Sequence, residues 1–159
     1  MIAQISVLLR VKQLKEEQAF RVMNAKRQQV AEALAAVDAA RIRREESAAT
    51  LPAREDAIYD EILRRVVGLT AIDDAKARVV VLEKEHAKLI DAHERAAHIH
   101  AKLVQELQVA VQAYRKTVKD RDKYMILTDE LRAAHDAQLS QREEAEVEDI
   151  FSTRRRRAA

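Results

Sequence analysis

The chain has 159 residues, of which 35% are charged and 3% are aromatic, and its formal net charge is +2. With so few large apolar side chains, much of the chain must stay in water, which argues against a compact globular core. A net charge this close to zero also argues against a general nucleic-acid binder, because such proteins carry a clear basic excess.

Residues that end helices or form reactive sites are scarce. The sequence has one Gly, one Pro and no Cys, so few turns separate its elements and thiolate chemistry is excluded. A single Gly cannot build a phosphate-binding loop, and no apolar run approaches the roughly 18 residues that span a bilayer. We therefore expect an all-α protein that is not an enzyme, has no catalytic, cofactor or metal site, and does not insert into a membrane.

The first predicted helix covers residues 2–47. Its apolar residues recur at steps of three and four positions, which indicates one packed face of a helix. Pro52 follows, and proline lacks the backbone N–H that a helix interior needs, although it suits the first position of a new helix. We therefore expect a kink or a brief break near Pro52 and a short helix over residues 53–67.

The chain is predicted to reverse direction near Gly68. Glycine suits the left-handed residue that closes a helix. Thr70 and Asp73 then have the spacing of a capping box, which predicts that the next helix begins at residue 71.

That last helix is predicted to run without interruption over residues 71–150. Two of its positions repeat every seven residues, the first at Ile72, Val79, His86, His93, His100, Leu107, Tyr114, Arg121, Thr128 and His135, and the second at Ala75, Leu82, Leu89, Ala96, Leu103, Ala110, Thr117, Tyr124, Leu131 and Gln138. A period of 3.5 residues predicts a coiled coil, which requires a partner helix. The reversal near Gly68 supplies that partner from the same chain, and a homodimer is the alternative.

The predicted fold is therefore a long antiparallel two-helix coiled-coil hairpin formed by a monomer. If the turn centres near residue 69, Leu9 lies opposite the neighbourhood of Asp129, and residues beyond about 139 have no partner helix. We expect residues 1–150 to form one hairpin domain and residues 151–159 to be a disordered basic tail.

Three histidines occupy consecutive core positions of the last helix. His86, His93 and His100 lie seven residues apart, roughly 10 Å along the axis, which is too far for one metal ion. We interpret them as polar positions that fix the register of the hairpin. The expected register places His93 near Glu45 and His100 near Asp38.

Two regions carry more apolar residues than a two-helix seam covers, which marks candidate docking surfaces. Near the reversal the candidate partner-binding residues are Tyr59, Ile62, Val80 and Val81, and at the other end they are Ile5, Leu8, Leu9, Tyr124, Ile126 and Leu127. Simple packing is the alternative at both ends: a third helix folded back at Pro52 near the reversal, and a wider seam at the other end.

Two sequence blocks resemble the YscO/FliJ family of coiled-coil stalk proteins from bacterial type III secretion systems and flagella. They are LLRVKQLKEEQA from Leu8 to Ala19 and YRKTVKDRDKY from Tyr114 to Tyr124. The opening of the first block favours the secretion (injectisome) branch.

The resemblance implies a non-enzymatic stalk protein in the bacterial cytoplasm, at the cytoplasmic face of the secretion apparatus. Such a protein associates with the ring-shaped export ATPase, connects it to the export gate protein of the inner membrane and, in some members, handles secretion chaperones. We expect the end that contains Leu8 to contact the ATPase and the end that contains Tyr59 to make the other contact. The alternatives are a generic dimeric coiled-coil scaffold unrelated to secretion, or a nucleic-acid or membrane-surface binder that uses Arg154 to Arg157.

Overall fold

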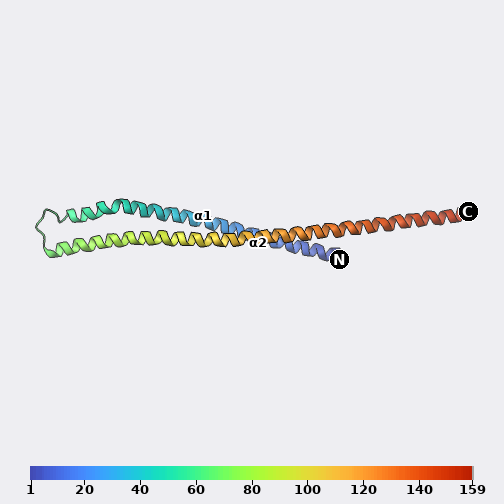
Figure 1. The fold of residues 1–159 in the computed structure, drawn as a ribbon, viewed down its shortest axis with the longest axis horizontal. Helices are drawn as coiled ribbons and strands as arrows, with labels where there is room; N and C mark the ends of the chain where they lie inside the picture. Colours follow the sequence, from blue (N-terminus) through green and yellow to red (C-terminus); the bar gives the residue numbers. More distant parts are fainter. Residues whose placement is uncertain (159) are drawn as a thin grey trace. The chain divides into compact units, whose positions relative to one another are not determined.

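The computed structural model describes residues 1–158, which form two helices and a turn. Helix α1 (Ile2–Asp60) and helix α2 (Leu69–Ala158) are joined by residues 61–68 (Figure 1). Contacts divide the chain into two units: unit 1 contains Met1–Met23 and α2 from Ala110 onward, and unit 2 contains Asn24–Val109. Within each unit a segment of α1 packs antiparallel against a segment of α2, which confirms the predicted all-α hairpin.

The least exposed residues of α1 recur at alternating steps of three and four. This spacing defines one face of a helix in a coiled coil. The series, buried or half-buried at every position, is Ile2, Ile5, Leu9, Lys12, Glu16, Ala19, Met23, Lys26, Val30, Ala33, Val37, Ala40, Arg44, Ser47, Leu51, Arg54 and Ile58.

Helix α1 passes through Pro52 without a break, so the prediction of separate helices over residues 2–47 and 53–67 is wrong. Pro52 lies on the exposed side of α1, and the seam spacing continues from Ser47 through Leu51 to Arg54. Proline lacks the backbone N–H that would bond to the Ala48 carbonyl, and side chains bond to two other carbonyl oxygens of the preceding turn. Thr50 Oγ1 donates to the Glu46 carbonyl at 3.0 Å, and the Arg54 guanidinium donates to Ser47 Oγ at 3.2 Å and to its carbonyl at 3.5 Å.

The reversal is broader than predicted and its special residues differ. The first helix ends at Asp60, and the left-handed residue of the turn is Arg64, with φ 66°, rather than Gly68. The Gly68 carbonyl accepts the N–H of Ala71 at 3.1 Å. Gly68 is therefore the N-cap of α2, and Thr70, the predicted cap, already lies inside the helix.

The heptad predicted for α2 is confirmed as its packing face. Both repeating positions are buried or half-buried from Ile72 to Leu131, whereas His135 and Gln138 are exposed. Every described residue after Leu131 is exposed, so α2 loses its partner somewhat earlier than residue 139, and Figure 1 shows this orange-to-red stretch without α1 beside it.

The predicted disordered tail is helical, since α2 continues to Ala158. Its last turn contains Arg155, Arg156 and Arg157. Cations at a helix C-terminus interact favourably with the unpaired carbonyl groups there, which explains why a basic segment continues the helix.

Polar pairs cross the seam at intervals and agree with the predicted register to within a few residues. In unit 1 Glu16 pairs with Arg121 at 3.0 Å. In unit 2 the pairs are Lys26 with Glu106 at 2.7 Å, Arg44 with His93 at 3.3 Å, Ser47 with His86 at 2.9 Å and Glu61 with Arg78 at 2.7 Å. The expected contact of His93 with Glu45 is therefore replaced by one with Arg44, whose Nη1 donates to the His93 Nδ1.

Replacing Gly68 by Ser should stabilise the hairpin by about 0.5–1 kcal/mol. A Cβ at this position meets no atom within 4 Å, and the φ of Gly68 is not positive. Serine restricts the unfolded chain and its hydroxyl can accept a free N–H of the first turn of α2. Urea unfolding followed by circular dichroism measures the change. Thr70→Ala is the control, and a cost of about 1 kcal/mol for it with no gain for Gly68→Ser would contradict the assigned cap.

Acid should weaken the hairpin partly through the pair of Lys26 with Glu106. The hydrogen bond and charge of Lys26 lower the pKa of Glu106 below its ordinary value of 4.5. Because the folded-state pKa is the lower one, the pair stabilises the fold above about pH 4.5, and this stability is lost as the pH falls through the folded value. The urea midpoint of Glu106→Gln should therefore fall less between pH 6 and pH 3 than that of the unaltered chain. Glu94→Gln, on an exposed side of α2, should leave the acid loss unchanged.

Candidate interaction surfaces

Each unit exposes apolar and charged side chains on the outside of its helices. Among residues 1–158, no group of three or more His, Cys, Asp or Glu side chains is placed to hold a metal ion. No helix in this part of the chain has an apolar stretch that is long enough to cross a membrane. The hollows that two helices form in each unit are open grooves, and apolar and charged side chains remain accessible around them.

In unit 1 the predicted contact residues divide into two groups. Ile5, Leu9 and Tyr124 are half-buried in the seam, and the Lys12 ammonium lies 5.1 Å from the centroid of the Tyr124 ring. These side chains are used for packing. Leu8, Ile126 and Leu127 are exposed to 46%, 55% and 36%, and they are free to contact a partner.

Further exposed apolar side chains adjoin these three on both helices. We call the whole set the N-terminal surface; it consists of Val7, Leu8, Val11 and Leu14 on α1 and Met125, Ile126 and Leu127 on α2. Leu8 and Leu127 each directly precede a seam residue, and in an antiparallel coiled coil such positions lie on the same side of the seam. Ile126, one position earlier on α2, points away from α1. The N-terminal surface therefore extends around unit 1 rather than forming a single flat patch.

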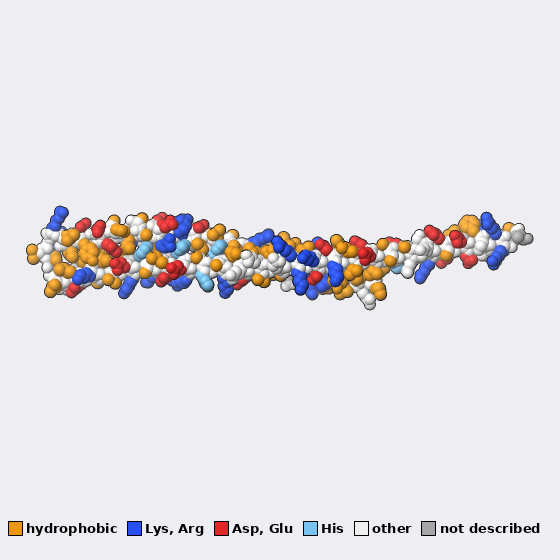
Figure 2. Space-filling view, in the orientation of Figure 1, with side chains coloured by type: hydrophobic (Ala, Val, Ile, Leu, Met, Phe, Trp, Pro, Cys, Tyr) orange, Lys and Arg blue, Asp and Glu red, His pale blue; other side chains and the backbone are white. Residues whose placement is uncertain are grey.

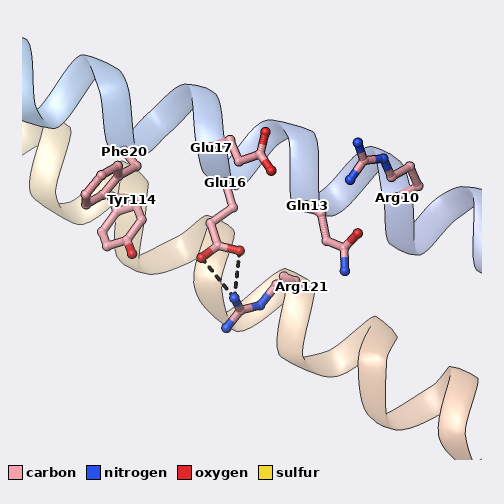
Figure 3. A pocket seen from close by; sticks show the side chains of 7 residues that line it. All are labelled: Arg10, Gln13, Glu16, Glu17, Phe20, Tyr114 and Arg121. Atoms are coloured by element: carbon pink, nitrogen blue, oxygen red, sulfur yellow. Dashed lines mark hydrogen bonds and ion pairs between the residues drawn. The ribbon is translucent and has the colours of Figure 1, made fainter.

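An open groove of about 470 Å³ lies along unit 1 and was not predicted (Figure 3). Its lining residues are Arg10, Gln13, Glu16, Glu17, Phe20, Tyr114 and Arg121. The rings of Phe20 and Tyr114 pack at a centroid distance of 5.5 Å and an angle of 51°. The groove thus offers one aromatic pair beside charged walls.

Arg121 forms the most connected charged contact of this groove. Its Nη1 donates to Glu16 at 3.0 Å and its Nη2 donates to Asp122 at 2.7 Å. These carboxylates, Asp122 first, raise the pKa of Arg121 above its ordinary value. The sequence contained one signal for this groove, because Glu16 and Arg121 are oppositely charged residues at seam positions that are normally apolar.

In unit 2 the predicted residues near the reversal also divide. Ile62 packs against the buried cluster of Ile58, Ala75 and Val79. Tyr59, Val80 and Val81 are exposed to 37%, 43% and 53%. The alternative of a third helix folded back at Pro52 is wrong, because α1 is continuous there.

The turn itself adds three strongly exposed apolar residues to unit 2. Leu63, Val66 and Leu69 are exposed to 56%, 107% and 80%, and Figure 2 shows apolar side chains gathered where the turn lies. We call the set of Tyr59, Leu63, Val66, Leu69, Val80 and Val81 the turn surface. No packing need of the hairpin accounts for these side chains, so the turn surface is a candidate contact site.

The sequence from residue 5 to residue 153 matches the family model described as type III secretion protein YscO. The chain belongs to the YscO family. The crystal structure of type III secretion protein YscO from Vibrio parahaemolyticus has the same fold, with a TM-score of 0.87, 18% sequence identity and coverage of 93% of both chains. A search of curated proteins finds no match. Family membership confirms the resemblance and contradicts the alternative of a scaffold unrelated to secretion.

The turn surface of this YscO-family protein should be dispensable for folding. Val66→Ser changes a side chain with no burial, so the free energy of unfolding should change by less than about 0.5 kcal/mol. Ile58→Ala removes a side chain that is only 7% exposed and should cost about 2–4 kcal/mol. Thermal and urea unfolding of both variants measure the difference. A large cost for Val66→Ser would show that the turn packs against the hairpin and presents no free surface.

Proposed function

We propose that this YscO-family protein is a non-enzymatic accessory protein of a bacterial type III export apparatus that couples the export ATPase ring to the export gate. The observation that carries the proposal is the presence of exposed apolar side chains in both units, beyond what the seam buries. Each unit therefore has a surface that a partner can cover. The coupling would be mechanical, through contacts of the two surfaces with different components.

In this proposal the N-terminal surface contacts the ATPase ring and the turn surface contacts the gate protein of the inner membrane. The protein acts as a monomer in the bacterial cytoplasm, at the cytoplasmic face of the apparatus, and also handles secretion chaperones. Support comes from the distribution of side chains. Between these surfaces along α1, the seam contains small and charged residues such as Ala33, Ala40 and Arg44, and the outer side chains are mostly polar residues and Ala.

The proposal predicts that Leu8→Ser and Ile126→Ser reduce secretion and weaken binding to the export ATPase of the same system. Both side chains are exposed, so the change should act through the contact rather than through folding. Leu34→Ser is the matched control, because Leu34 is exposed to 48% and Leu8 to 46%, yet Leu34 lies in neither surface. Secretion by cells that produce each variant and co-purification with the ATPase provide the two measurements.

A separate variant tests the contact proposed for the turn surface. Val80→Ser should leave ATPase binding intact and reduce binding to the cytoplasmic part of the gate protein. If secretion continues normally with folded Leu8→Ser, Ile126→Ser and Val80→Ser proteins, the model of two contact surfaces is wrong. If Leu34→Ser is as harmful as Leu8→Ser, the contact is not confined to the proposed surfaces.

A further inference from the structure

The final stretch of α2, residues 132–158, is a helix whose described side chains are all exposed. Helices in water gain most of their stability by packing one face against a partner. This stretch has such a face, because Leu139, Val147, Ile150 and Phe151 are apolar and exposed to 43%, 51%, 58% and 63%. Figure 2 shows apolar and basic side chains together near the C-terminal end of α2. The stretch is therefore an amphipathic helix that lacks a packing partner within its own unit.

Its charges are separated into two blocks that cannot neutralise each other on the same helix. The acidic block consists of Glu143, Glu144, Glu146, Glu148 and Asp149, and the basic block is Arg154 to Arg157. Side chains on one helix interact when they are three or four residues apart. The last acid, Asp149, precedes Arg154 by five residues, so no acid of the block reaches the basic block in this way, and Glu146 alone has another arginine, Arg142, at this spacing.

We propose that this stretch pairs with the same stretch of a second copy of the chain, antiparallel and around a two-fold axis at Ile150. The acidic block is centred on Glu146 and the basic block lies around Arg155 and Arg156. An antiparallel partner brings unlike blocks together when the axis falls near Ile150. Glu146 then lies beside the partner's Arg154, and Glu143 lies beside the partner's Arg157.

The axis required by the charges coincides with the apolar residues of the stretch. Ile150 sits on the axis and meets its own copy, while Val147 lies one turn away on the same face. A two-fold contact of this kind uses one patch twice, so every favourable pair occurs twice. A parallel pair would instead place arginine beside arginine and acid beside acid, which is destabilising. The charges thus select both the partner and its direction.

The pairing concerns the free protein and does not depend on the proposed role in secretion. The paired stretch is about 15 residues long, or roughly 22 Å, which is short for a coiled coil. We therefore expect a weak dimer that forms at high protein concentration and low salt and dissociates at high salt. In this dimer the arginine block stays bound to the acidic block of the second copy until a partner that binds more tightly displaces that copy.

Crosslinking of single cysteines tests the direction of pairing, because the chain has no Cys of its own. Ile150→Cys should be captured as a covalent dimer by a short bismaleimide, since the two cysteines meet at the axis. Leu139→Cys should not, because its copies would lie roughly 33 Å apart at 1.5 Å per residue. Capture at both positions would indicate a parallel pair, and capture at neither would indicate that another molecule covers this helix. Either result overturns the proposal.

Charge exchange tests the contacts themselves. One variant changes Arg154, Arg155, Arg156 and Arg157 to Glu, and the other changes Glu143, Glu144, Glu146 and Glu148 to Lys. In sedimentation at low salt, each variant alone should be monomeric, whereas an equal mixture should form dimers at least as well as the unaltered chain. Because all the changed positions are exposed, the hairpin should stay folded. The arginine-to-glutamate change removes the favourable cations at the C-terminus of α2, so circular dichroism is used to check that each variant keeps its helix content. Dimers of either variant alone, or no dimers in the mixture, would refute the pairing.

Discussion

The structure depends on one continuous pattern, the alternation of three- and four-residue steps that keeps one face of each helix against the other. Few large side chains fill this seam, and among residues 1–158 three of the six buried apolar residues are Ala33, Ala75 and Ala110. Such a seam buries little apolar area at each step, so its stability is spread along the helices. Ion pairs and hydrogen bonds at Glu16, Lys26 and Ser47 then fix which residues face each other, a role that polar core positions commonly have.

The heptad of α2 could be read from the sequence because its two packing positions recur in nine consecutive heptads, from Ile72 to Leu131. The continuity of α1 through Pro52 could not be read from the sequence, because local preference favours a break there whereas a proline on the exposed side of the helix leaves the seam intact. The prediction of the turn was wrong for a related reason. Local preference favoured Gly68 as the left-handed residue of the turn. Because α1 ends at Asp60, the left-handed residue is instead Arg64.

The candidate contact residues were also only partly predictable from the sequence. An excess of apolar residues correctly indicated exposed side chains at Leu8, Ile126 and Val81, yet it could not separate them from Ile5, Leu9 and Tyr124, which the heptad phase places in the seam. The repeats read from both helices already place Ile5, Leu9 and Tyr124 on the packed faces, so sorting the apolar residues by these repeats gives the division. The groove beside Phe20 and Tyr114 needed the three-dimensional structure, since it arises from side chains on two helices.

A seam of this kind has a consequence for how the molecule comes apart. Each residue touches only neighbours along the same helix and a short stretch of the other, as in repeat proteins, so distant parts gain little from each other's order. Opening can then begin at one place and stop before it spreads, and amide hydrogen exchange would report a gradient instead of a single cooperative event. A partner that separates the two helices in one region would therefore leave the rest of the coiled coil packed.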